Sequence, residues 1–198
     1  MDTIRLANLN DAAAVLSIYA PIVRDTATSF ELDPPGTDEM RHRLEETLKR
    51  YPWLVYENEH GVLGYAYAGS FRARPAYQWT VEVSVYIRED SRGAGIGKAL
   101  YEALFDCLRR QGYCNAVAGI VLPNPASLRL HERLGFRKVG VFHRMGYKFG
   151  AWHDVAWWEL PLRPAADPPS APGVLSASIL RVVPDGGGAR FEGPDELV

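Results

Sequence analysis

The chain has 198 residues, of which 47% are hydrophobic and 23% are charged, proportions that are ordinary for one soluble globular domain. Its formal net charge is −2, which gives no reason to expect a nucleic acid or an anionic membrane surface as a partner. Neither a membrane-spanning stretch of ~20 apolar residues nor a signal peptide is found, so we expect a cytoplasmic protein with no membrane or nucleic-acid partner.

Apolar periodicity and turn signals predict strands and helices that alternate along the chain. A strand over 3–7 precedes a helix that Asn10 can cap, and Thr37 can cap a second helix with Met40 and Leu44 on its apolar face. The elements expected next are strands at 53–56, 62–70 and 80–87, a helix at 95–111, a strand at 114–122, a helix at 125–134 and strands at 136–146 and 152–162. This order predicts the α/β class, with a central twisted mixed sheet flanked by helices.

The composition changes after the domain expected at 1–163. Six prolines and the run Gly186-Gly187-Gly188 lie in the tail at 164–198, which we expect to be largely flexible. Within it, residues 174–183 are apolar enough to dock on the domain as a short strand or helix.

The cysteines and histidines do not have the spacing of a metal site. Cys107 and Cys114 lack the paired arrangement of zinc ligands and are expected to be reduced core thiols. The histidines are scattered at His42, His60, His131, His143 and His153. We therefore expect no metal.

A glycine-rich loop follows the strand expected at 80–87 and reads Arg92-Gly93-Ala94-Gly95-Ile96-Gly97-Lys98. Alternate glycines allow backbone N–H groups to converge on anionic oxygens at a helix N-terminus, and the two flanking cations add donors. The dinucleotide-binding and phosphate-loop patterns both fail here, because they require other residues at Arg92, Lys98, Ala99 or Leu100. What remains is the pattern R-x-x-G-x-G, or an ordinary glycine-rich turn that caps a helix.

A second motif runs from Asn124 to Phe136. Asn124 is a good N-cap, Pro125 suits the first helical position, and Gly135 can end the helix in a left-handed conformation. Ser127 and His131 lie one turn apart within it, but neither an acid to complete a hydrolase triad nor a nucleophile elbow accompanies them.

Together, these two motifs resemble the coenzyme-binding signatures of the GCN5-related N-acetyltransferases, the GNAT superfamily. The segments 71–82 and 146–154 narrow the resemblance to the phosphinothricin N-acetyltransferase branch, and the likeness extends from about residue 3 to about residue 162. It implies the GNAT fold, acetyl-CoA as co-substrate, and acetylation of the α-amino group of phosphinothricin, methionine sulfoximine or a related small amino acid. The reaction would be a direct attack within a ternary complex.

The resemblance also implies which residues hold the coenzyme. Backbone groups of the strand at 80–87 would bond the pantetheine amides, because the family separates this strand from the one at 114–122. The alternative, that these strands simply pair, can hold for part of their length. The expected coenzyme-binding residues are Val85, Tyr86, Ile87, Arg92, Gly93, Ala94, Gly95, Ile96, Gly97, Lys98, Asn124 and Ser127.

Glu82 is the expected general base. Strand alternation places it on a polar face, roughly 16 Å from Ile87, a distance comparable to the reach of a pantetheine arm. An amine is mostly protonated at neutral pH and must lose a proton before it attacks, which Glu82 could accept directly or through water. The alternative is a structural ion pair between Glu82 and Arg72 or Arg74.

His131 stands where many members of the superfamily carry a tyrosine, and the phosphinothricin branch also has histidine there. It could protonate the departing thiolate or orient a water, since imidazole titrates near neutrality. A structural histidine bonded to a carbonyl is the alternative.

The acceptor is expected to contact Phe30, Arg72, Arg74 and Tyr77, with the arginines holding a carboxylate or phosphinate. The alternative for the last three residues is a solvated basic loop. Glu31, next to Phe30, could select against strongly anionic ligands.

Aromatic residues accumulate near the end of the expected domain, where they can form either a homodimer interface or sheet core. They are Tyr147, Phe149, Trp152, Trp157 and Trp158. Two other functions stay open: acetylation of another small amine or a protein N-terminus, and a sensor that binds acetyl-CoA without turnover. The presence of Glu82, His131 and Arg74 disfavours the sensor.

Overall fold

The structure is a computed structural model that describes residues 2–174, 181–185 and 188–191. The helices are α1 (Ala12–Asp25), α2 (Thr37–Leu48), α3 (Ile96–Gln111) and α4 (Pro125–Arg133). The strands are β1 (Thr3–Leu6), β2 (Trp53–Asn58), β3 (Gly61–Ser70), β4 (Thr80–Ile87), β5 (Asn115–Val121), β6 (Arg137–Lys148), β7 (Ala151–Pro161), β8 (Arg181–Asp185) and β9 (Gly188–Phe191). No helix in these residues is long and apolar enough to cross a membrane.

The described strands form one sheet in the order β6-β7-β5-β4-β3-β2-β1-β8-β9. Only β4 and β5 run parallel, and all other neighbours in this part of the chain are antiparallel. The mixed sheet and the α/β class expected from the sequence are therefore confirmed.

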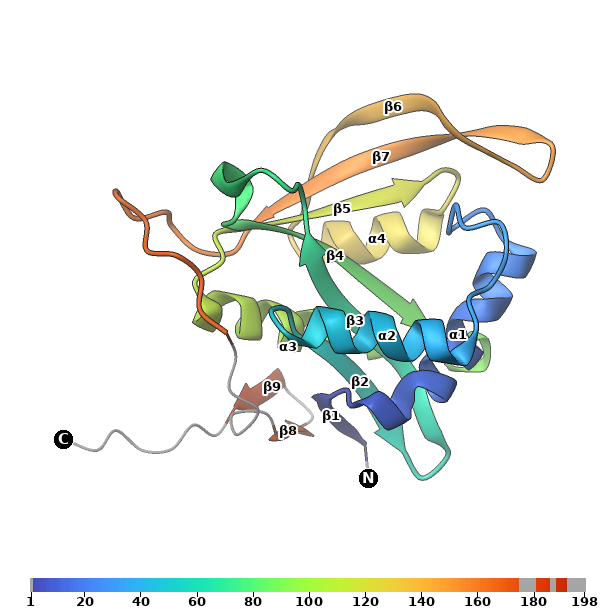
Figure 1. The fold of residues 1–198 in the computed structure, drawn as a ribbon, viewed down its shortest axis with the longest axis horizontal. Coiled ribbons are helices and arrows are strands. Elements are labelled where there is room, and N and C mark those ends of the chain that lie inside the picture. The colour runs from blue at the N-terminus through green and yellow to red at the C-terminus, as the bar shows by residue number, and fades with distance from the viewer. Residues whose placement is uncertain (1, 175–180, 186–187, 192–198) are drawn as a thin grey trace.

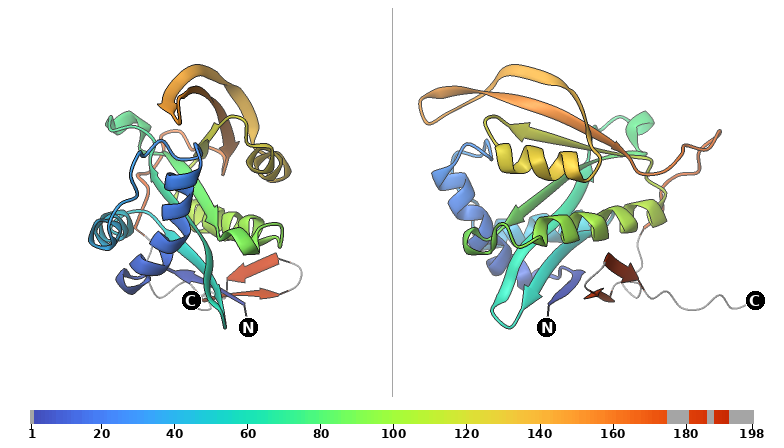
Figure 2. Two further views of the ribbon diagram at one scale, coloured as in Figure 1. Left: turned by 90° about the vertical axis from the view of Figure 1, so that its right-hand side faces the viewer. Right: turned by 180° about the vertical axis from the view of Figure 1, so that it is seen from behind.

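Helices cover both faces of the sheet, with α1 and α2 on one face and α3 and α4 on the other (Figure 1 and Figure 2). The amphipathic helix α3 buries Leu100, Leu104 and Leu108 against the sheet. Both cysteines are buried free thiols, as expected.

The helix starts differ from the expectation. Asn8, and not Asn10, caps the chain before α1: its side chain accepts the N–H of Asn10 at 2.9 Å, while the Asp11 carboxylate accepts the N–H of Asn8 at 2.8 Å. This reciprocal bonding closes a short 3₁₀ turn ahead of the helix. Thr37 is the first helical residue of α2, because the preceding Gly36 is extended and takes the cap position.

The strands β4 and β5 pair over only three positions, from Thr80 with Asn115 to Glu82 with Val117. Beyond Glu82 they separate, as Figure 1 shows, and β5 continues alongside β7 instead. The separation expected from the family resemblance is present, and Glu82 lies where it begins.

The segment after β7 contacts the domain before the sheet is extended by β8. The indole N–H of Trp79 donates to the Ser170 carbonyl at 2.7 Å, and the N–H of Gly173 donates to the Gln111 carbonyl at 2.7 Å. Of the docking segment expected at 174–183, residues 175–180 lie outside the described residues. Residues 181–185 form β8, which pairs with β1.

Candidate active site

A narrow cleft of about 60 Å³ lies between the separated parts of β4 and β5. It is lined by five residues that the sequence singled out, which are Val85, Tyr86, Asn124, Ser127 and His131. They come from β4 and α4, and residues 118–121 of β5 form part of the wall. Residues from two motifs about forty positions apart thus meet at one site.

The glycine loop before α3 uses its glycines for two reasons. Gly93 and Gly95 have φ angles of 84° and 85°, which L side chains rarely adopt. A Cβ at Gly97 would instead lie 3.3 Å from the Leu130 side chain and 3.8 Å from Ile87. Gly97 therefore allows α3 to pack closely against its neighbours, a role that the sequence alone did not indicate.

The same loop presents unused donors. Within the described chain, the N–H groups of residues 93–97 donate no hydrogen bond. They lie at the N-terminus of α3, where the helix dipole favours negative charge, and the side chains of Arg92 and Lys98 are exposed beside them. This arrangement fits the pyrophosphate of a coenzyme.

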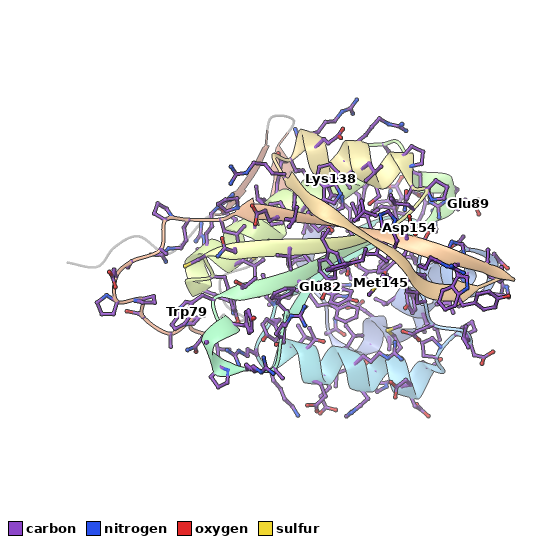
Figure 3. The ribbon with its side chains drawn as sticks, turned by 90° about the horizontal axis from the view of Figure 1, so that it is seen from above. Trp79, Glu82, Glu89, Lys138, Met145 and Asp154 are labelled. Atoms are coloured by element: carbon purple, nitrogen blue, oxygen red, sulfur yellow. The ribbon has the colours of Figure 1, made fainter. Side chains whose placement is uncertain are left out.

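Glu82 is half-buried on β4, near the centre of the molecule in Figure 3, whereas Trp79 just before the strand lies toward the edge. Among the described residues, its carboxylate forms no hydrogen bond and no ion pair with Arg72 or Arg74. Burial raises the pKa of Glu82, and the charge of Arg72 opposes that rise. A carboxylate with a raised pKa is a stronger base than an exposed one.

The hydrogen bonds of His131 fix its tautomer. The residue is 3% exposed, and Nδ1 lies 2.8 Å from the Ser127 carbonyl, which can only accept, so Nδ1 carries the proton. In the neutral ring, Nε2 is then an acceptor, 3.3 Å from the Tyr101 hydroxyl. Burial lowers the pKa of His131 and outweighs the opposing effect of the Ser127 carbonyl. The geometry favours the structural alternative for this residue.

Tyr101 is a site residue that the sequence analysis missed. It lies on the buried face of α3, lines the cleft and donates its hydroxyl to His131. Its only sequence signal was an apolar position on an amphipathic helix, which indicates core packing equally well.

The residues expected at the acceptor lie at the rim. Arg72, Arg74 and Tyr77 are exposed between β3 and β4, and the Arg72 guanidinium stacks 5.1 Å from the centroid of the Phe71 ring. Phe30 lies in the α1–α2 loop, with its ring centroid 6.3 Å from that of His153. The structure thus places the arginines and Phe30 on separate loops, and within the described residues no hydrogen bond or ring contact joins them.

The negative charge of Glu31 is compensated by neighbouring side chains. Arg43 donates to its carboxylate at 2.6 Å, and the Tyr19 hydroxyl donates at 2.8 Å. Burial raises the pKa of Glu31, but these hydrogen bonds and the charge of Arg43 outweigh it and leave the pKa lowered. A compensated carboxylate repels an anionic acceptor less than the sequence suggested.

The aromatic residues near the end of the domain divide between core and surface. Trp158 is buried, whereas Tyr147, Phe149 and Trp152 are each more than half exposed on β6, β7 and the turn between them. Trp158 is therefore sheet core, whereas a homodimer interface stays a prediction for the exposed members.

One group in the described chain has metal-binding residue types at close range. His42, Glu45 and Glu46 on α2 offer ligand atoms within 4.8 Å of one another, and all three are exposed. Their spacing does not match a metal-site sequence pattern. The expectation that the protein binds no metal stays a prediction.

Comparisons with known proteins agree with this geometry. The protein-family model described as acetyltransferase (GNAT) domain matches residues 4–157 of this chain. The phosphinothricin N-acetyltransferase of Streptomyces viridochromogenes is 43% identical over 81% of this chain and 90% of its own length. The L-methionine sulfoximine/L-methionine sulfone acetyltransferase of Salmonella typhimurium is 39% identical over 84% of this chain and 98% of its own. A solved relative is the GNAT superfamily phosphinothricin acetyltransferase from Sinorhizobium meliloti, crystallised in complex with acetyl-CoA. Its sequence is 37% identical to this chain, and the two structures superpose with a TM-score of 0.78 over 81% of this chain and 88% of that one.

Proposed function

The chain belongs to the GNAT acetyltransferase family, and we propose that it transfers the acetyl group of acetyl-CoA to the α-amino group of a small amino acid of the methionine sulfoximine or phosphinothricin type. The observation that carries this proposal is Glu82, an unpaired carboxylate with a raised pKa at the point where β4 and β5 separate. The names of the relatives support the donor and the class of acceptor.

The donor would bind along the cleft and the glycine loop. In the part of the chain that the structure describes, β4 is unpaired on its cleft side beyond Glu82. The backbone groups of Val85 and Ile87 point to that side and are available to the pantetheine amides, whereas those of Tyr86 pair with Tyr65 of β3, so Tyr86 would contribute its side chain. The N–H groups of residues 93–97, with Arg92 and Lys98, would hold the pyrophosphate. Asn124 and Ser127 contribute through the capped start of α4, where the Asn124 side chain accepts the Ser127 N–H at 3.1 Å.

Glu82 would prepare the acceptor for attack. It takes a proton from the acceptor ammonium, directly or through water, which frees the nitrogen lone pair. The new N–C bond would then form at the thioester carbonyl, the C–S bond would break, and the sulfur would leave with the bonding pair. The nitrogen would lose its second proton to water or to the departing thiolate, which gives the amide and the free thiol. Backbone N–H groups at the strand edge suit the developing oxyanion, because fixed dipoles need no reorganisation.

His131 would act as a positioning residue. A thiol with a pKa of ~8.5 leaves as a thiolate without much assistance, so a proton donor is not essential at this step. The neutral imidazole has committed Nδ1–H to Ser127 and accepts from Tyr101, so it has no proton directed at the sulfur. Its role is to fix the Tyr101 side chain in the cleft wall.

The acceptor would be held at the rim by Arg72, Arg74, Tyr77 and Phe30. The arginines can bind a carboxylate or a phosphinate in a bidentate manner. Because Glu31 is compensated by Arg43, an anionic acceptor such as phosphinothricin is compatible with this site.

We also propose a cytoplasmic homodimer. The exposed apolar side chains of β6, β7 and their turn offer a surface for a second copy of the chain; they include Phe142, Met145, Tyr147, Phe149 and Trp152. Light scattering on the wild type and on Trp152→Glu should show a dimer and a monomer, respectively; a monomeric wild type would contradict this assignment.

The function is tested by measuring thiol release from acetyl-CoA with methionine sulfoximine, methionine sulfone, phosphinothricin and a panel of ordinary amino acids and polyamines. Saturable turnover with any of the first three supports the proposal. Turnover with another amine alone would keep the acetyltransferase but change its acceptor. Binding of acetyl-CoA without thiol release toward any amine would favour the sensor.

A further inference from the structure

Lys148 is a buried lysine at the end of β6. The residue is 4% exposed, and Nζ donates to the Val23 carbonyl at 2.6 Å and to the Ser29 carbonyl at 2.9 Å. Lysine is rarely buried without such partners, because an ammonium group loses much hydration free energy when it leaves water. The position of this side chain therefore depends on these two bonds.

The two carbonyls belong to the end of α1 and to the first part of the connection between α1 and α2. Val23 lies in the last turn of α1, and Ser29 directly precedes Phe30. The connection passes close to the β6–β7 hairpin in both Figure 1 and Figure 2. One side chain from β6 thus joins the end of α1 to the loop that follows it, both more than a hundred residues away in sequence.

A second contact fixes the same loop. A Cβ at Gly146 would lie 2.6 Å from the Phe30 ring, so glycine alone lets this ring rest on β6. The ring of His153 lies beside Phe30, and His153 Nε2 is 3.0 Å from the Lys148 carbonyl. Phe30 is therefore held against the same end of the hairpin that Lys148 anchors.

The loop is also anchored from the helix side. Glu31 is bonded to Tyr19 of α1 and to Arg43 of α2, and its negative charge acts favourably on the Lys148 ammonium. The position of Phe30 thus depends on Glu31 at one side and on Lys148 at the other.

We propose that Lys148 is a positioning residue for the acceptor: by bonding Val23 and Ser29, it holds the α1–α2 loop so that Phe30 forms one wall of the acceptor site. This inference rests on the proposed function, because it assigns Phe30 to acceptor binding. Lys148 does not itself touch the acceptor, and it has no part in binding acetyl-CoA.

Steady-state kinetics on Lys148→Met test this inference, with Lys138→Met as the matched control. Lys138 is an exposed lysine on the same strand, labelled in Figure 3. We expect Lys148→Met to raise KM for the amino acid about tenfold or more and to leave KM for acetyl-CoA within about twofold. The control should change neither constant. Equal changes in both KM values, or an unchanged KM for the amino acid, would overturn the inference.

Two further measurements keep the test decisive. If Lys148→Met does not fold, Gly146→Ala on the same strand displaces the Phe30 ring directly and should raise KM for the amino acid. An unchanged KM would refute the role of Phe30 as a wall of the acceptor site. Amide hydrogen exchange of residues 26–31 should be faster in Lys148→Met than in Lys138→Met; equal exchange would refute the anchor. Since exchange needs no turnover, it distinguishes failure of this inference from failure of the proposed function, which absence of wild-type turnover would show.

Discussion

Two carboxylates in different regions of the chain differ in their hydrogen-bond partners and in the direction of their pKa shifts. Asp11, ahead of α1, is 7% exposed and accepts two hydrogen bonds from Arg5, at 2.7 and 2.8 Å, and one from the N–H of Asn8. Glu82, on β4, is half-buried and has no such partner in the described chain. Burial raises the pKa of both, but at Asp11 the hydrogen bonds outweigh burial and leave the pKa lowered.

On the proposed function, this difference separates a carboxylate that stabilises the fold from one that would act as a catalytic base. The lowered pKa of Asp11 means that its ionised form stabilises the native state above its unfolded pKa, and this contribution is lost as pH falls through the folded pKa. The raised pKa of Glu82 has the opposite sign: the native state disfavours its ionisation, so stability decreases as pH rises through the pKa range of this group. The proposed role as base would explain why a group that lowers stability at neutral pH lies at this position.

Replacement of Glu82 should have the largest effect on turnover. Glu82→Gln removes the base, and kcat should fall by about 100-fold to 10,000-fold, the usual contribution of general base catalysis. Because the variant also removes a poorly compensated charge, its melting temperature should equal or exceed that of the wild type at neutral pH. Thiol release and thermal unfolding measure the two effects, and an unchanged kcat would eliminate Glu82 as the base.

Replacement of Asp11 should show the reverse pattern. Asp11→Asn breaks charged hydrogen bonds with Arg5, which keeps Glu57 as a partner at 2.7 Å, so we expect a loss of about 2 kcal/mol in the free energy of unfolding. The stability that the wild type loses as it is acidified should be correspondingly smaller in the variant. Urea titrations across pH measure this, and kcat should remain at the wild-type value. A loss of turnover in a folded Asp11→Asn protein would contradict the purely structural role of Asp11.

His131 tests whether a buried titratable group can border the cleft without donating a proton. If His131 only positions Tyr101, His131→Gln should reduce kcat by less than about tenfold, below the range of general acid catalysis. The native protein should still be destabilised, because the hydrogen bonds to Ser127 and Tyr101 are disturbed. Tyr101→Phe, measured in parallel, removes the same contact from the other side. A loss of more than 100-fold in His131→Gln would restore the proton-donor role.

Replacement of Arg72 should have the smallest effect, a shift in the pH dependence of kcat. Its charge opposes the raised pKa of Glu82, so Arg72→Gln should move the acid limb of the kcat profile to higher pH. The measurement is kcat at saturating acceptor across pH, compared with Arg74→Gln as a control of similar exposure. A limb that does not move, or moves to lower pH, would show that Arg72 does not act on the base.

The sequence predicted what depends on local patterns. It located β4 to the residue, because the alternation of valines with polar residues is local, and it found the Asn124 cap and the glycine loop for the same reason. It missed Tyr101 and Lys148, whose partners lie thirty and more than a hundred residues away. It also did not show that Arg43, on a different element, compensates the charge of Glu31; the effect of Glu31 on acceptor selection stays a prediction. The sequence could not predict which charged side chains from distant elements pair in the folded protein.

The most direct test of this account is the rate at which N-acetyl amino acid forms in a single turnover with acetyl-CoA and methionine sulfoximine, measured for wild type, Asp11→Asn and Glu82→Gln after each is shown to be folded. We predict that Asp11→Asn forms product at the wild-type rate and that Glu82→Gln is at least about 100-fold slower. Equal rates in all three proteins, or a loss in Asp11→Asn that matches that in Glu82→Gln, would contradict the assignment of Glu82 as the base.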